Sequence, residues 1–149
     1  MQVPDSNRTA EPSVCASPVA VHNRPIPTIL LVEDEAFVRE VACEILRLAG
    51  YRVLPARNAA EAVPAFLAHR EEVQLLLTDV VLPDRNGRDL AFDLVTLGHT
   101  FRIIFISGYP ENSVTRNGFQ KPGWFYLPKP FSAASLLQKV HEVMNEASM

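Results

Sequence analysis

The chain has 149 residues, 48% of them hydrophobic, and a formal net charge of −3, which suits one globular domain with a buried core. No basic block stands out, so the sequence argues against nucleic acid or an anionic membrane surface as a partner. No apolar run approaches the length of a membrane span, and the N-terminus lacks the apolar centre of a signal peptide.

Residues 1–25 are polar and rich in Pro, Ser and Asn, a composition typical of a mobile tail, so we assign residues 26–149 to the folded domain. Cys15 lies in this tail and is expected to be exposed. Cys43 lies in a helical pattern and is expected in the core. This placement argues against a disulfide framework and fits a reducing cytoplasm.

Short, continuously apolar runs alternate with segments of helical period along the rest of the chain. The runs predict strands at 28–34, 51–56, 73–79, 101–107 and within 124–130. The periodic segments predict helices at 35–50, 58–70, 88–98 and 132–146.

Several residues fix where these helices begin and end. The first helix should stop at Gly50, whereas Asn58 and Ser132 are good N-caps for the second and the last. Pro64 inside the second helix predicts a kink or a late start. In the first helix the apolar residues at helical spacing are Phe37, Val38, Val41, Ile45, Leu46 and Leu48.

The segment 108–123 differs from the others because it holds three Gly, two Pro and two Asn. We expect a degenerate fourth helix there, reduced to one irregular turn around 112–116. Before the third helix, Asp84 and Asn86 are expected to be turn residues that set up this helix, and Gly87 to supply an unusual backbone angle.

Alternation of apolar strands with helices predicts an α/β fold with a parallel sheet covered on both faces. Such a doubly wound, five-stranded parallel sheet usually has the flavodoxin-like order 2-1-3-4-5. Ligands then bind outside the carboxyl ends of the strands, where the winding reverses between the first and third strands.

Polar residues gather at those predicted strand ends: Glu33, Asp34, Asp79, Ser107 and Lys129. Three crowded carboxylates repel one another, and Mg²⁺ prefers such oxygen ligands together with water and phosphate. Asp34 and Asp79 are the expected direct ligands, with Glu33 acting through water. Asp79 is the expected nucleophile, with Lys129 and a Ser107 hydroxyl beside it, so the sequence predicts a phosphoryl-transfer site.

Four motifs, "LLVEDE", "LLLTDVVLPDRNG", "FISGY" and "YLPKPF", stand in order along roughly residues 27–147. With them the chain resembles the response-regulator receiver domains of two-component signalling. The resemblance implies phosphorylation of Asp79 by a sensor histidine kinase or a histidine phosphotransfer protein. It also implies Mg²⁺ bound by Asp34, Asp79 and the backbone carbonyl of Val81.

The same resemblance implies that Ser107 and Lys129 hold the phosphoryl oxygens and that the Lys129–Pro130 peptide bond is cis. Tyr126 matches the aromatic residue that changes rotamer on activation. The sequence departs from the usual pattern at Glu33, where Asp is frequent. Tyr109 after the Ser-Gly pair resembles receivers attached to, or partnered with, certain sensor kinases.

The leading hypothesis is a single-domain signalling receiver in the cytoplasm, which catalyses only its own phosphorylation and dephosphorylation. The chain ends soon after the last helix, so we expect it to act through contacts with an unknown downstream protein or in a phosphorelay. One alternative is an aspartate-nucleophile phosphatase, although such enzymes need a second acid where this chain has Val81. The other is an interaction module that does not depend on phosphorylation.

Overall fold

The computed structural model describes residues 26–97, 101–108 and 124–145. The predicted tail with Cys15, the irregular turn at 112–116 and Tyr109 therefore lie outside the described residues. No helix in the described ranges is long and apolar enough to cross a membrane.

A five-stranded parallel sheet forms the centre of the molecule, in the order β2-β1-β3-β4-β5, as predicted. The winding reverses between the neighbouring strands β1 and β3, and this place is the switch point of the sheet. The strands are β1 (Thr28–Val32), β2 (Arg52–Ala56), β3 (Val73–Asp79), β4 (Arg102–Ser107) and β5 (Trp124–Pro128).

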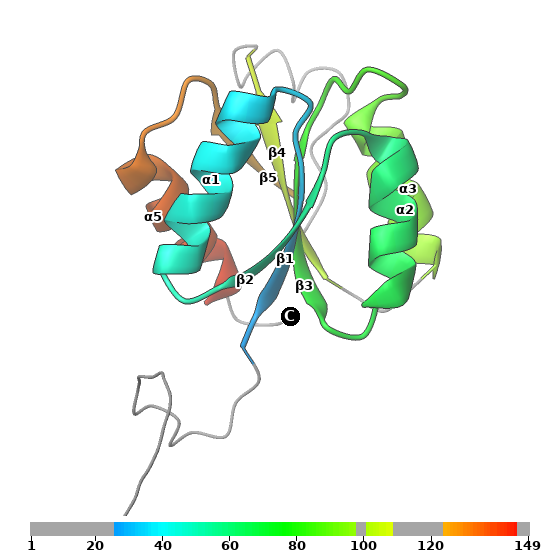
Figure 1. The fold of residues 1–149 in the computed structure, drawn as a ribbon, viewed down its shortest axis with the longest axis horizontal. Coiled ribbons are helices and arrows are strands. Elements are labelled where there is room, and N and C mark those ends of the chain that lie inside the picture. The colour runs from blue at the N-terminus through cyan, green and yellow to red at the C-terminus, as the bar shows by residue number, and fades with distance from the viewer. Residues whose placement is uncertain (1–25, 98–100, 109–123, 146–149) are drawn as a thin grey trace, which may run out of the picture.

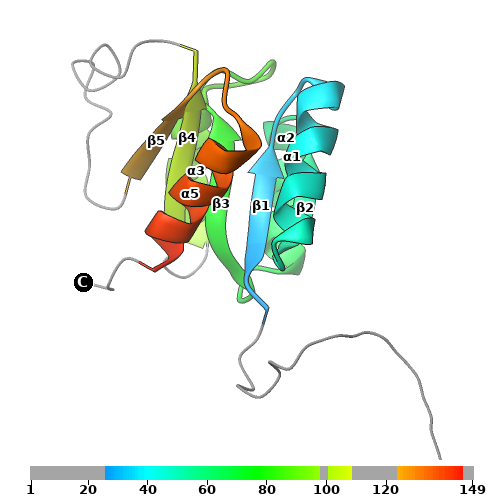
Figure 2. The same cartoon turned by 90° about the vertical axis from the view of Figure 1, so that its left-hand side faces the viewer.

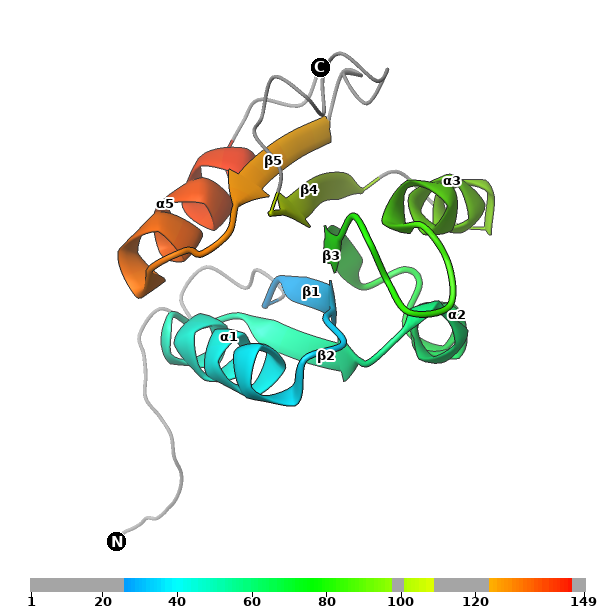
Figure 3. The same cartoon turned by 90° about the horizontal axis from the view of Figure 1, so that it is seen from above.

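Helices cover both faces of this sheet, α1 and α5 on one and α2 and α3 on the other (Figures 1 and 3). In the side view of Figure 2, α1 and α5 lie in front of the strands. Their bounds are α1 (Ala36–Leu48), α2 (Ala59–Ala68), α3 (Gly87–Leu97) and α5 (Ala133–Met144).

Each central strand contributes side chains to two separate cores, one on each face of the sheet. In β1, Leu30 and Val32 join the core under α2 and α3, whereas Ile29 and Leu31 join the core under α1 and α5. All four side chains are fully buried, and each such burial contributes about 1.5–3 kcal/mol. Packing on both faces holds the ends of the strands in place.

Helix α1 faces the sheet with two small residues and one leucine. Ala42, Cys43 and Leu46 are buried, which confirms Cys43 as a core residue. By contrast, Phe37 is 73% and Leu48 is 82% exposed, so the apolar periodicity of this helix is only partly a core pattern. The chain leaves α1 through Gly50, whose φ of 101° is a left-handed conformation that suits glycine.

The predicted caps are in place. The Asn58 side chain accepts a hydrogen bond from the backbone N–H of Glu61, and Ser132 accepts one from Ser135 at the start of α5. Helix α2 begins immediately after Asn58 and continues through Pro64, so the late start considered for it is wrong. Capping at Asn58 and burial of the helix on the sheet outweigh the single hydrogen bond that proline removes.

Candidate functional site

The predicted polar residues meet at the carboxyl edge of the sheet. Asp79 and Ser107 are the last residues of β3 and β4, and Lys129 directly follows β5. Glu33 and Asp34 follow β1. A pocket of about 330 Å³ opens here, and Asp34, Asp79, Ser107 and Lys129 are among the residues that line it.

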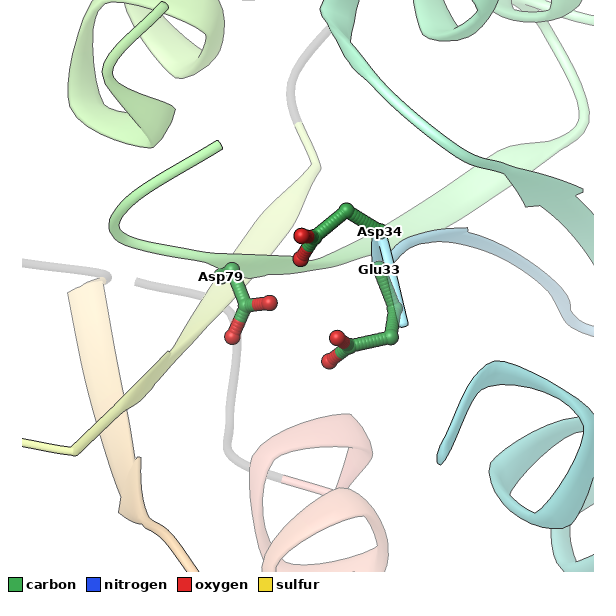
Figure 4. A group of neighbouring side chains, drawn as sticks. All are labelled: Glu33, Asp34 and Asp79. Carbon is green, nitrogen blue, oxygen red and sulfur yellow. The ribbon is translucent and has the colours of Figure 1, made fainter. Parts of the chain in front are cut away.

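Three carboxylates converge at this edge from two neighbouring strands. Glu33, Asp34 and Asp79 each offer an oxygen, and these atoms lie within 4.8 Å of one another (Figure 4). Glu33 is 1% and Asp79 4% exposed, whereas Asp34 is open to solvent. Two buried acids and one exposed acid form an oxygen-rich site that suits a hard divalent cation such as Mg²⁺.

Lys129 supplies the positive charge next to the two buried acids. Its Nζ lies 3.0 Å from Oδ1 of Asp79 and 3.3 Å from Oε1 of Glu33. Burial lowers the pKa of Lys129, but its hydrogen bond to Asp79 and the charges of both acids outweigh this, and the net pKa is raised. The ammonium group therefore remains protonated at neutral pH.

At Asp79 the burial of the carboxylate outweighs its ion pair with Lys129. Burial and, next, the negative charge of Glu33 raise its pKa from 3.8 to about 7, although the hydrogen bond from Lys129 opposes the rise. One ammonium group thus fails to offset the cost of two buried carboxylates. A second positive charge at the site would favour the ionised form of Asp79.

The backbone at the end of β1 is fixed by two residues of the following segment. Glu33 accepts a hydrogen bond at Oε2 from the N–H of Glu35, 3.1 Å away. The guanidinium of Arg39 donates to the carbonyl oxygens of Glu33 and Asp34 at 2.8 and 3.4 Å. Sequence reasoning did not single out Arg39, although a cation one turn into a helix that follows two acids is a usable signal.

The loop after Asp79 closes back on β3. Val81 pairs with Asn86 as an isolated antiparallel bridge, and the N–H of Gly87 donates to the carbonyl of Val80 at 2.6 Å. Asn86 accepts at Oδ1 from the N–H of Arg88, so it sets up α3 as predicted.

The prediction that Gly87 supplies an unusual backbone angle is wrong. Among the described residues only Gly50 is a glycine with positive φ. Gly87 is required for space instead, because a Cβ at this position would collide with the carbonyl oxygen of Asp79. The glycine therefore lets the start of α3 approach the backbone of Asp79.

Ser107 and Tyr126 lie on the side of the site formed by β4 and β5. Ser107 is 5% exposed, and its carbonyl accepts a hydrogen bond from the N–H of Lys129 at 2.8 Å. Tyr126 is buried and stacks on Phe105 with ring centroids 5.7 Å apart. The Lys129–Pro130 bond is cis, as the resemblance implied.

Comparison with known proteins agrees with this geometry. Residues 29–141 match the family model described as the response regulator receiver domain. The chain is 35% identical over 119 residues to the sensor kinase CckA of Brucella abortus, a match that covers 80% of this chain but only 13% of that kinase. It is also 29% identical to the receiver protein CpdR of the same organism, over 78% of this chain and 95% of CpdR.

Solved structures of receiver domains also match this chain. The receiver domain of the hybrid histidine kinase CckA matches with a TM-score of 0.66 and 33% identity, over 79% of this chain and 99% of that domain. The non-phosphorylated HemR receiver domain of Leptospira biflexa matches with a TM-score of 0.72 and 30% identity, over 83% of this chain and 98% of that domain. The chain therefore belongs to the response regulator receiver domain family of two-component systems.

Proposed function

We propose that this receiver domain accepts a phosphoryl group on Asp79 from a histidine kinase or a histidine phosphotransfer protein. The observation that carries the proposal is the convergence of Asp79 with Glu33, Asp34 and Lys129 at the switch point of the sheet. A carboxylate oxygen of Asp79 would attack phosphorus, forming a P–O bond while the P–N bond to the donor imidazole breaks. The donor nitrogen leaves with the electron pair of that bond.

Mg²⁺ is the cofactor proposed for this site. Asp34, Asp79 and the backbone carbonyl of Val81 would hold the ion, with Glu33 acting through water. When bound, the ion supplies charge that neutralises the phosphoryl oxygens. The donor set fits, because it consists of carboxylates and a carbonyl with no nitrogen or sulfur ligand.

Lys129 and Ser107 would hold the phosphoryl oxygens on the opposite side. The ammonium already lies within 3.3 Å of both oxygens of Asp79, so it reaches any group attached there. Such a donor stabilises charge on the transferring group without moving far. Tyr126, which lies two residues before the end of β5, is the aromatic residue proposed to change rotamer when Asp79 is phosphorylated.

The exposed apolar stripe on α1 supports a protein partner. Phe37, Val41 and Leu48 fall on one side of the helix and are 73%, 39% and 82% exposed. The helix begins two residues after Asp34, so a donor protein that covers this stripe lies beside the pocket. Phe37→Glu should slow transfer from a phosphorylated donor protein and leave transfer from acetyl phosphate unchanged.

The alternative of a phosphatase with an aspartate nucleophile is not favoured. Its general acid would lie two residues after Asp79, where Val81 presents an apolar side chain. We propose instead a signalling protein of the cytoplasm that acts through a downstream protein or a relay. The similarity to receivers of sensor kinases and to CpdR supports this assignment.

Acetyl phosphate with Mg²⁺ separates the alternatives. A receiver becomes stably phosphorylated and releases phosphate slowly. A phosphatase turns acetyl phosphate over continuously without accumulating phosphoprotein. A module that does not depend on phosphorylation does neither, and that outcome would contradict the proposal.

A further inference from the structure

Asp84 reaches from the loop after β3 to the start of α2. Its Oδ1 accepts a hydrogen bond from the N–H of Ala59 at 3.0 Å, and its Oδ2 accepts one from the N–H of Ala60 at 2.9 Å. These are N-terminal N–H groups of α2, which have no partner within their own helix. The carboxylate of a distant loop therefore completes the cap that Asn58 begins.

The loop that carries Asp84 also shapes the proposed metal site. It starts at Val80, directly after Asp79, and contains Val81, whose carbonyl is a proposed ligand. The bridge from Val81 to Asn86 and the approach of Gly87 to Asp79 fix the two ends of the loop. The described contacts of its tip are the two hydrogen bonds of Asp84 to α2 and an ion pair of 2.6 Å between Arg85 and Asp93 of α3.

Helix α2 is a firm support for this tip. Ala59, Ala62 and Phe66 bury against the sheet at 1%, 0% and 0% exposure. Attachment to this helix restricts the loop more than attachment at its two ends alone would. The link between Asp84 and α2 then helps to set the position of the Val81 carbonyl.

We propose that Asp84 is a positioning residue for Mg²⁺ binding, acting through the loop that presents the Val81 carbonyl; this inference rests on the proposed function. The carboxylate form suits the role, because negative charge at a helix N-terminus is favourable. The hydrogen bond from the Ala59 N–H lowers the pKa of Asp84, so the group stays ionised wherever the site can bind Mg²⁺.

Asn58→Ala provides a matched control. Asn58 caps the same helix end through the N–H of Glu61 but donates nothing to the loop after β3 in the described contacts. Both Asp84→Ala and Asn58→Ala remove an N-terminal cap of α2, and both should lower the melting temperature. Only Asp84→Ala also removes a contact between α2 and the loop after β3.

The experiment titrates MgCl₂ into each full-length variant, following backbone amide chemical shifts, and then measures the phosphorylation rate with acetyl phosphate against Mg²⁺ concentration. Loss of an outer partner of a metal site typically costs at least tenfold in affinity, so Asp84→Ala should need about ten times more Mg²⁺ for half-saturation. Its rate at saturating Mg²⁺ should equal that of the wild type. Asp84→Asn keeps one acceptor oxygen, so its half-saturating Mg²⁺ concentration should rise less than that of Asp84→Ala.

Unchanged half-saturation in Asp84→Ala while the wild type binds Mg²⁺ would overturn the inference and leave the proposed function intact. Equal shifts in Asp84→Ala and Asn58→Ala would also overturn it, because the effect would then come from α2 stability alone. A wild type that binds no Mg²⁺ would overturn the proposed function together with the inference.

Discussion

Lys129 and Asp79 form an ion pair in which one ammonium nitrogen contacts both carboxylate oxygens, at 3.0 and 3.3 Å. The same ammonium lies 3.3 Å from Oε1 of Glu33, so it is shared between two buried acids. Burial of Asp79 and, next, the negative charge of Glu33 raise the pKa of Asp79 to about 7, and the shared ammonium does not cancel this rise. The raised pKa of Asp79 should make both the stability of the protein and its Mg²⁺ affinity depend on pH.

Asp79→Asn should stabilise the protein more at pH 8 than at pH 5 when Mg²⁺ is removed with EDTA. The folded state raises the pKa of Asp79 from 3.8 to about 7, so it binds this proton more tightly than the unfolded state does. Stability from the protonated form is complete below about pH 3.8, falls as the pH rises and is lost above about pH 7. Since pH 5 lies two units below the raised pKa of about 7 and each unit corresponds to about 1.4 kcal/mol, the difference between pH 5 and pH 8 should be about 2–3 kcal/mol.

Urea denaturation at the two pH values measures this difference. Glu71→Gln, which removes an exposed carboxylate outside the site, controls for the loss of one negative charge. Equal stabilisation by Asp79→Asn at both pH values would show that the site does not hold Asp79 at a raised pKa.

Mg²⁺ affinity should rise with pH between 6 and 7 and level off above 7. At pH 6 most Asp79 carboxyl groups carry a proton, because the pKa is about 7, and the metal must displace that proton. The gain should approach about tenfold per pH unit well below this pKa. Amide chemical shifts followed during MgCl₂ titrations report the affinity.

Asp34→Ala should abolish this binding at every pH, since it removes a direct ligand. Binding of Mg²⁺ by Asp34→Ala with wild-type affinity would reject the ligand assignment. An affinity that is flat between pH 6 and 8 would instead reject competition between the metal and a proton at Asp79.

Gly87→Ala and Gly50→Ala should destabilise the fold for different reasons and by different amounts. A methyl group at Gly87 meets the carbonyl oxygen of Asp79, so it should destabilise the fold by on the order of 3 kcal/mol and displace the loop that carries Val81. At Gly50 there is space, and alanine should cost only about 1–2 kcal/mol because φ is 101°.

Thermal denaturation ranks the two glycine variants, and Mg²⁺ titration separates them further. Gly50→Ala should bind Mg²⁺ like the wild type, whereas Gly87→Ala should bind it less tightly. Comparable stability and comparable Mg²⁺ binding in both variants would show that contact with Asp79 is not what requires a glycine at position 87.

Val81→Asn should shorten the lifetime of the phosphorylated state. Val81 is 61% exposed two residues after Asp79 and offers no side-chain hydrogen bond to an attacking water. An amide there can orient this water, and one hydrogen bond contributes about 0.5–1.5 kcal/mol, or about twofold to tenfold in rate. Loss of the phosphoryl group from purified phosphoprotein measures the rate, with Val81→Ile as the control because isoleucine, like valine, offers no side-chain hydrogen bond. If Val81→Asn loses phosphate no faster than the wild type, this position does not set the lifetime.

Much of the fold and the site follows from the sequence because both rest on simple regularities. Apolar strands that alternate with helices specify a parallel sheet, and its topology brings strand ends together, so Asp79 and Lys129 could be paired across 50 residues of sequence. The ionic contacts of Glu33 follow from the same rule. None of these inferences needs a knowledge of side-chain conformations.

Other features depend on tertiary packing that no local pattern encodes. Leu46 and Leu48 lie on opposite sides of α1, and both sides carry apolar residues, so apolar character alone does not tell that Leu46 is buried and Leu48 exposed. Asp84 has the sequence context of a turn residue, yet its partners lie 25 and 24 residues away at α2. Gly87 also has the sequence context of a turn glycine, but glycine is needed there because a side chain would collide with the backbone of Asp79.

The position of the phosphoryl group tests directly whether Asp79 is the acceptor. The wild type and Asp79→Asn are treated with acetyl phosphate and Mg²⁺ and then reduced with borohydride, which converts an aspartyl phosphate to homoserine. Mass spectrometry of the digested protein should find homoserine at position 79 alone in the wild type and at no position in Asp79→Asn. Homoserine at position 34 or at another acid, or equal phosphorylation of Asp79→Asn, would show that Asp79 is not the phosphoryl acceptor.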